Sequence, residues 1–227
     1  MTFRKMMMTG VCAGFLVAML PPTARASTDA QNLVDQSRVT LDDVKKDKEF
    51  GNAPDLLHRA KAVMIVPALF KGGFFVGGEG GTGVVMTRGT GDHWSYPAFY
   101  TLVSASFGLQ IGAEQSELVL IALTDRARQA FLQDEFMIGA EAGLAVVTLG
   151  ASAEAASTSN LKADIVVWTS SSGAYAGLTL NGSVIKPRQR YNEEYYGRAI
   201  GPAEIESGAS ISNHGADRLR HALGSIS

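Results

Sequence analysis

Three glutamates recur in the same local setting, at the end of short β-like segments rich in small residues. The segments are VGGE at residues 76–79, IGAE at 111–114 and IGAE at 138–141, spaced by 35 and then 27 residues. If one sheet brought Glu79, Glu114 and Glu141 together, their carboxylates could bind a metal or perform acid–base chemistry. Glutamates at strand ends more commonly face water without either role, and we favour that interpretation.

Other short patterns match known motifs but lack the context that those motifs need. Gly78, Gly80 and Gly83 have the spacing of a dinucleotide-binding loop, but a strand-like VVMT follows where a helix should meet the pyrophosphate. Residues 159–162 match Ser-x-x-Lys without its companion motifs. The four histidines have no partner at metal-ligand spacing. We therefore predict no catalytic residue, no metal site and no cofactor.

A group of cations in the last quarter of the chain is the more informative candidate. Lys186, Arg188 and Arg190 alternate in the sequence KPRQR, and residues two apart point the same way in an extended segment. Three cations on one face suit a phosphate group. Tyr195 and Tyr196 follow, and tyrosine suits a boundary between apolar and wet surroundings. A solvated strand edge whose charges discourage aggregation is the alternative, and both interpretations stay open here.

The first 26 residues have the features of a cleaved secretory signal peptide. Arg4 and Lys5 precede an apolar run over residues 6–20, and Ala-Arg-Ala at 24–26 forms a small-x-small cleavage site. The apolar run is short for a membrane-spanning helix. Cys12 lacks the preceding small residues and the longer upstream run that a lipid-modified cysteine requires. We therefore expect cleavage after Ala26 and no covalent lipid.

Removal of this leader changes the charge of the protein. The chain of 227 residues carries 20 basic and 22 acidic side chains, and the leader takes three of the basic ones, which leaves a net charge of −5. Attraction of the whole protein to nucleic acid is therefore excluded, and an anion must be bound by a local cluster. The mature chain has no cysteine, and its length suits a single domain over residues 27–227.

Hydrophobic patterning places helices mainly at the ends of this domain and strands in its middle. An amphipathic helix is predicted over residues 30–50, a second after the break at 52–55, another after a cap at Thr124 and a last one over 216–223. The first helix lacks the Lys/Arg and aromatic content of membrane-surface helices, so we expect it to pack on the sheet.

Strand-like runs predict the rest of the fold, at residues 101–113, 118–123, 136–149, 164–169 and 174–180. The predicted class is α+β. It contains an antiparallel, glycine-rich curved β-sheet, barrel-like if strongly curved, with helices at the N-terminus, one mid-chain and one near the C-terminus.

Residues 61–88 are the stretch around which the sheet is organised. An apolar run ends at Pro67, and a second extended run over 72–78 enters the glycine cluster GGEGGTG at 77–83. We predict a strand, a turn and a glycine-rich hairpin, in which the glycines supply a tight turn or a close approach between strands. The three glutamate segments predict strands that need small residues at the same depth of one sheet.

Several motifs occur together over residues 30–200. They are AKAV at 60–63, Pro67, KGGF at 71–74, GGEG at 77–80, ASFGLQIGA at 105–113, residues 136–143, DIVV at 164–167, YAGL at 175–178 and NEEYYG at 192–197. In this order they resemble the SYLF-domain family. Members of that family bind phospholipids, and in eukaryotes phosphoinositides, where some also associate with actin.

The resemblance implies a non-enzymatic lipid-binding module, here of a secreted bacterial branch. We expect it to lie in the periplasm or outside the cell, peripheral to a membrane, with an anionic phospholipid surface as its partner and no nucleic acid. Charge and position give the predicted lipid-binding residues: Lys71, Lys186, Arg188, Arg190, Tyr195 and Tyr196. The alternative function is a structural envelope protein that contacts protein partners through a sheet edge and binds lipid only incidentally. An envelope hydrolase that uses the glutamates is the third alternative.

Processing of the leader is the first testable prediction. Intact-mass measurement on the exported protein should show a product that begins at Ser27 without added acyl mass, because the Ala-Arg-Ala site is well placed and the context of Cys12 is poor. A product that begins at Cys12 and carries acyl groups would contradict it.

Overall fold

The computed structural model describes most of the chain after the predicted leader. The described residues are 28–48, 50, 52–73, 76–89, 91, 93–107, 112–138, 144–148, 163–170, 180, 182–208 and 211–226. Their elements, in chain order, are α1 (Asp29–Lys46), α2 (Ala53–Arg59), β1 (Ala62–Gly73), β2 (Val76–Thr87), β3 (Ala98–Phe107), β4 (Gly112–Ala122), α3 (Asp125–Ala130), β5 (Phe136–Met137), β6 (Val146–Thr148), β7 (Ile165–Thr169), β8 (Val184–Pro187), α4 (Gln189–Tyr196), α5 (Pro202–Ser207), the 3-10 helix η3 (His214–Ala216) and α6 (Asp217–Gly224).

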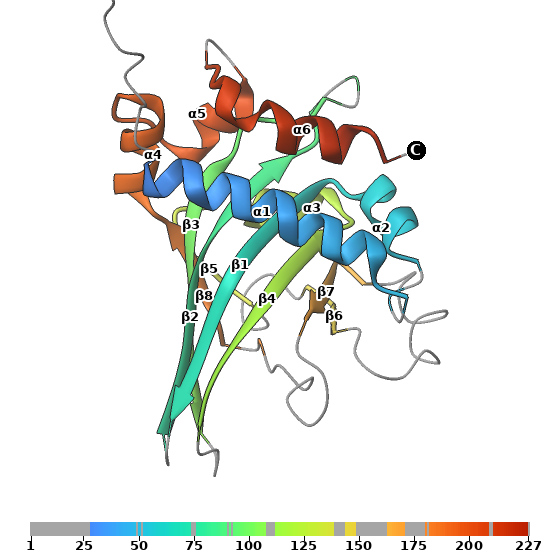
Figure 1. Cartoon of the computed structure of the whole chain (residues 1–227), viewed down its shortest axis with the longest axis vertical. Coiled ribbons are helices and arrows are strands. Elements are labelled where there is room, and N and C mark those ends of the chain that lie inside the picture. Colours follow the sequence, from blue (N-terminus) through green and yellow to red (C-terminus); the bar gives the residue numbers. More distant parts are fainter. Residues whose placement is uncertain are drawn as a thin grey trace, which may run out of the picture.

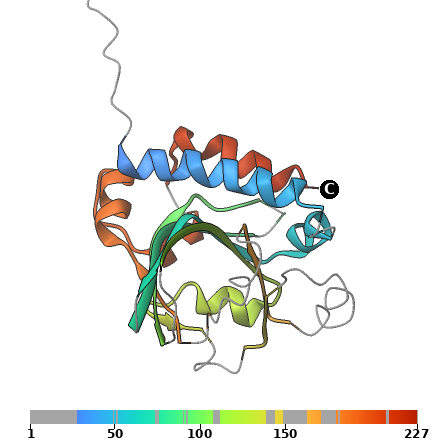
Figure 2. The same ribbon diagram turned by 60° about the horizontal axis from the view of Figure 1, so that its bottom comes forward.

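Within these ranges, eight strands form one sheet in the order β5-β8-β3-β2-β1-β4-β7-β6. All neighbours are antiparallel except β6 and β7, which are parallel. The sheet curls into a half-barrel, and α1 and α6 lie side by side across its convex side while α3 lies in the hollow (Figure 2). The predicted α+β class and the curved antiparallel sheet are confirmed.

Each face of the central strands packs into its own core. On β1, Val63 and Ile65 pack with α1, α2 and α6 on the convex face, and Met64 and Val66 pack with α3 on the concave face. Because both faces are covered near the helices, the strands there are apolar at successive positions rather than alternating. Below the helices, β1 to β4 continue as long strands (Figure 1).

Local capping chemistry sets the starts of two helices, and the first of them, predicted over residues 30–50, ends at Lys46. Thr28 caps α1, and its Oγ1 accepts from the Gln31 amide at 3.2 Å. Thr124 caps α3 in the same way, as predicted. The predicted N-terminal helix packs on the sheet, where its Thr40 hydroxyl donates to the Glu117 carboxylate of β4 at 2.6 Å.

The glycine cluster is not a hairpin turn, and that part of the prediction is wrong. Residues 77–83 lie inside β2, while β1 ends at Gly73 and β2 begins at Val76. A Cβ added to Gly83 would stand 2.3 Å from Ile65 O, and one added to Gly81 would stand 2.7 Å from Ala68 O. The cluster therefore serves the predicted alternative, a close approach between strands.

This close approach accommodates a β-bulge in β1. Ile65 pairs with Val84 and Ala68 with Thr82, so a step of three residues along β1 matches a step of two residues along β2. The pairing of β1 with β4 shifts over the same residues. The predicted strand break at Pro67 is wrong, because the proline sits in the bulge of a continuous strand. An extra residue also reverses which side chains face which side.

Two strand boundaries differ from the predictions. The predicted strand over 101–113 combines β3, which ends at Phe107, with the start of β4 at Gly112. Apolar and small residues run through the junction, so hydrophobicity gave no boundary signal there. The expected strand over 174–180 and the end of the expected strand over 136–149 lie largely outside the described residues.

The small-residue motifs lie at the same depth of the sheet, as predicted for the first two copies. Lys71 of β1 pairs with Glu79 on one side and with Glu114 on the other. Gly72 likewise pairs with Gly78 and with Ala113. The third copy begins at Ile138, directly after β5, and its Glu141 lies outside the described residues.

The glycine packing can be tested by stability. Gly83→Ala should lower the free energy of unfolding by about 1–3 kcal/mol, because its Cβ would overlap the β1 backbone. The matched control is Gly78→Ala, whose Cβ meets nothing nearer than Ser104 O at 3.6 Å; it should leave the free energy of unfolding unchanged or raise it by up to about 1 kcal/mol. Urea unfolding measures both. Equal losses in the two variants would contradict this explanation.

Candidate functional site

The predicted cations do not lie on one extended segment, and that premise is wrong. Lys186 lies on β8, Arg188 is the N-cap of α4, and Arg190 is in the first turn of that helix. A helix begins here because Arg188, whose amide still donates to Phe99 O of β3 at 2.8 Å, accepts through its own carbonyl oxygen from the amides of Tyr191 and Asn192. Strand periodicity therefore cannot place the three side chains.

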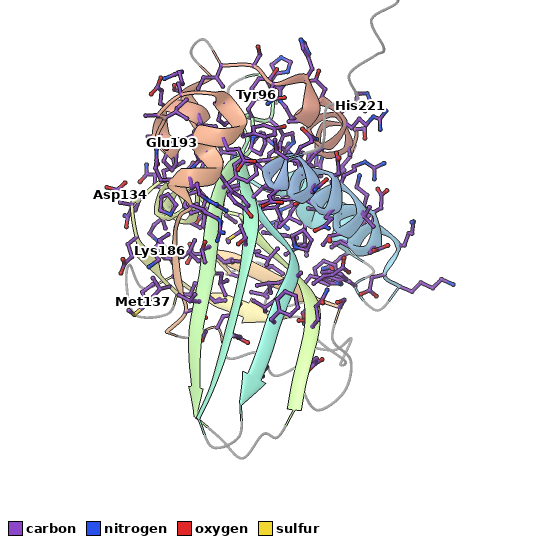
Figure 3. All side chains as sticks on the ribbon, turned by 60° about the vertical axis from the view of Figure 1, so that its left-hand side comes forward. Tyr96, Asp134, Met137, Lys186, Glu193 and His221 are labelled. Atoms are coloured by element: carbon purple, nitrogen blue, oxygen red, sulfur yellow. The ribbon has the colours of Figure 1, made fainter. Side chains whose placement is uncertain are left out.

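The tertiary structure nevertheless brings Lys186 and Arg188 together on the convex face. Lys186 pairs with Thr101 of β3, and Thr101 pairs with Thr82 of β2. Arg188 reaches across β3, where its Nη1 donates to Thr82 Oγ1 at 3.3 Å. Figure 3 shows Lys186 beside the edge of β3, below α4.

Arg188 and Arg190 share one aromatic ring. Their guanidinium carbons lie 4.2 and 5.4 Å from the ring centroid of Tyr191, within the range of cation–π attraction. In the part of the chain that the structure describes, neither arginine nor Lys186 forms a salt bridge. We call Lys186, Arg188 and Arg190 the cationic edge.

The two predicted tyrosines lie deeper than the cationic edge. Tyr195 is 7% exposed, and its ring packs edge-on against Phe99 at 5.0 Å between centroids. Tyr196 is half-buried and donates its hydroxyl hydrogen to Pro97 O at 2.7 Å. Both rings therefore fasten α4 to the sheet, as does Asn192, whose Oδ1 accepts from the Phe99 amide at 2.8 Å. Tyr191, which sequence reasoning did not choose, is the ring beside the cations.

Lys71 is not brought to the cationic edge. It lies on the concave face between Glu79 and Glu114, its partners on β2 and β4. Burial raises the pKa of Glu79, and Lys71 and a hydrogen bond from Ser104 oppose that rise. The two carboxylates thus flank an ammonium group. Among the described residues, no three His, Cys, Asp or Glu side chains lie close enough together to hold a metal ion.

Sequence reasoning missed an apolar part of the convex face. Phe70 is 58% exposed and Val103 is 40% exposed. Both line an open groove of about 370 Å³ together with Leu33 of α1. The bulge in β1 hid this signal, because alternation counted from Ile65 puts Phe70 on the wrong face.

A second hollow, of about 440 Å³, lies among basic side chains. Its lining includes His58, Arg59, Lys61 and Arg88. Arg88 donates to Leu57 O at 3.0 Å and covers the Trp94 ring, while Arg59 pairs with Asp55 at 3.5 Å. These contacts cap the C-terminus of α2, which explains the basic residues without a ligand. No described helix has the length and hydrophobicity to cross a bilayer.

Glu206 of α5 is the described carboxyl group with the most strongly shifted pKa. Burial raises its pKa to about 8, and nearby Ser95 and Arg128 only partly oppose the rise. Its negative charge in turn raises the pKa of Tyr100 and of Tyr196, after the larger effect of their own burial. The carboxyl oxygens of Glu206 are buried and do not belong to the cationic edge. We therefore expect Glu206 to affect the stability of the fold and not the binding of a ligand.

The pH dependence of unfolding tests this assignment. The native state keeps the Glu206 proton up to about pH 8, whereas the unfolded chain loses it near 4.5. The free energy of unfolding should therefore fall as the pH rises between these values, by up to ~1.4 kcal/mol per pH unit. Glu206→Gln should make this slope shallower, since the raised pKa of Glu79 contributes in the same direction, and Glu194→Gln on the surface of α4 should leave the slope unchanged. Urea unfolding at several pH values gives the measurement. Identical slopes in Glu206→Gln and wild type would contradict the role assigned to Glu206.

Comparison with known proteins places this architecture in a family. The family model described as "Ysc84: Las17-binding protein actin regulator" matches residues 103–226. Protein YSC84 of Saccharomyces cerevisiae is 31% identical over 188 residues, which is 79% of this chain and 40% of that protein. LAS seventeen-binding protein 3 of the same species is 32% identical over 161 residues, covering 68% and 35%.

A human protein, SH3 domain-containing YSC84-like protein 1, is 30% identical over 182 residues, which is 77% of this chain and 53% of that protein. The chain thus spans about a third to a half of the length of these relatives. Since more than half of its residues lie inside the family match, the chain belongs to the Ysc84 family, the SYLF-domain family that its motifs resemble.

Proposed function

We propose that this protein is a non-enzymatic module of the bacterial envelope that docks on anionic phospholipid surfaces through the cationic edge. Its export after removal of residues 1–26 is part of the proposal. The observation that carries it is the position of Lys186 and Arg188, cations without an acidic partner among the described residues, on the face where Phe70 and Val103 are exposed. Adjacent cationic and apolar side chains match the interface of an anionic bilayer.

Electrostatics favours this face over the rest of the protein. The chain without its leader is net acidic, so attraction to anionic lipid must come from a local group of cations. Each basic residue close to such a surface contributes about 1 kcal/mol, and salt screens the attraction over ~8–10 Å. Three cations in one group thus support weak, salt-sensitive and oriented binding.

Binding of a protein partner is the second candidate function. The name of one yeast relative refers to LAS seventeen binding, and the family description refers to Las17 binding and actin regulation. Such binding by this chain would need its own interface. The outermost strands, in the ranges the structure describes, are β5 with two residues and β6 with three. Such short edges offer few backbone groups for a partner strand.

Charge reversal tests the proposed function. The triple variant Lys186→Glu, Arg188→Glu, Arg190→Glu should lower the affinity for phosphatidylcholine vesicles that contain phosphatidylglycerol by about a hundredfold or more at low salt. Folding should survive, because glutamates at the start of α4 suit the helix dipole. Vesicle cosedimentation at low and high salt gives the measurement.

A control variant separates local charge from net charge. It carries Lys48→Glu, Lys61→Glu and Arg218→Glu, which replace three exposed cations that are not part of the cationic edge. The control changes the net charge equally and should keep most of the binding. Equal losses in both variants would move the site away from the cationic edge. A wild-type protein that binds neither neutral nor anionic vesicles would end the lipid proposal and favour the protein partner.

A further inference from the structure

One row of residues on the convex face forms a slot with a bare floor. Phe70 of β1 pairs with Gly80 of β2, and Gly80 pairs with Val103 of β3. The aromatic ring and the valine are both largely exposed, and the position between them has no side chain. The groove of about 370 Å³ on this face is lined by these three residues and by Leu33 at its upper end. This volume is at the small end of the range for ligand pockets.

The fold does not require the glycine that keeps this slot open. A Cβ on Gly80 would meet Leu102 O at 3.5 Å and Val103 Cγ1 at 3.6 Å, which are ordinary contacts. Gly81 and Gly83 differ, because added Cβ atoms there would clash with β1. Glycine inside a strand costs roughly 0.5–1 kcal/mol relative to alanine and often marks a close approach of a ligand to the backbone. The packing of the sheet therefore does not require Gly80, and its missing side chain leaves the floor of the groove open.

The slot changes from apolar to polar and cationic along its length. The next row toward α1 pairs Thr82 with Thr101 and Thr101 with Lys186. Arg188 donates to Thr82 Oγ1 through Nη1, which uses one of the five donors of a guanidinium group. An apolar channel therefore ends beside two cations and two hydroxyl groups.

We propose that the slot takes one acyl chain of an anionic bilayer phospholipid, with the charged headgroup against Arg188 and Lys186. This inference rests on the proposed function and specifies its site. Charge complementarity selects the ligand, because a chain with an anionic end matches an apolar slot with a cationic end. The volume suits a single chain, so the second chain stays in the bilayer. The groove is open on its solvent side, and a chain can enter sideways without the lipid leaving the membrane.

A filled slot tests the inference. Gly80→Val should weaken binding to phosphatidylcholine–phosphatidylglycerol vesicles by about tenfold or more, because each methylene kept out of the slot costs about a factor of four. The matched control is Gly78→Val, on the same strand and face but outside the groove lining, where an added Cβ is equally tolerated. Its binding should stay within about a factor of two of wild type. Phe70→Ser removes one wall without filling the floor and should also weaken binding.

A fluorescent probe reports occupancy directly. Phe70→Trp puts an indole on the slot wall, whereas Trp94 and Trp168 are buried elsewhere at 3% and 4% exposure. Phosphatidylglycerol with brominated acyl chains in the vesicles should quench the new tryptophan, and adding Gly80→Val should remove that quenching. Quenching by brominated lysolipid monomers but not by vesicles would overturn the bilayer as the source of the chain.

The outcomes separate this inference from the proposed function. If Gly80→Val and Phe70→Ser bind vesicles like wild type while the triple charge reversal does not, the slot is overturned and docking through the cationic edge stands. If wild type binds no vesicle, both fail. If Gly78→Val loses binding as strongly as Gly80→Val, the effect belongs to the strand, and the slot is again overturned.

Discussion

The bulge in β1 is the constraint on which the lower half of the sheet depends. One extra residue between Ile65 and Ala68 reverses the alternation of β1 against both neighbours. Gly81 and Gly83 accommodate the bulge, because a Cβ at either position would clash with the β1 backbone. The register beyond the bulge puts Phe70 on the convex face and Lys71 on the concave face.

The two faces of the sheet differ in how their charged side chains are paired. On the concave face, Lys71 lies between two glutamates, so the charges compensate one another within the protein. On the convex face, the cations of the cationic edge have no such partners among the described residues and lie next to exposed apolar side chains. The paired charges on the concave face favour the observed strand register. The cations on the convex face, next to exposed apolar side chains, are available to bind a ligand.

The Ysc84 family match includes only part of the convex face. The family match starts at Val103 and includes the whole cationic edge, while β1 and β2 lie outside it. The individual relatives align over up to 79% of the chain, so their similarity covers more residues than the family match does. The family match therefore includes all three cations of the cationic edge. The slot between β1 and β3 lies mostly outside that match, and its description depends on the structure of this chain.

The sequence alone determined the elements whose causes are local. The capping side chain Thr124 predicted a helix start, and the recurrent small residues predicted a shared depth in one curved sheet. The group of cations and the family motifs could likewise be identified from the sequence. Only the tertiary structure decided that Lys71 faces away from Lys186, that Arg188 begins a helix, and that Tyr195 is buried. These facts depend on a register shift and on contacts between distant strands, and the energy of such contacts is not written in any local pattern.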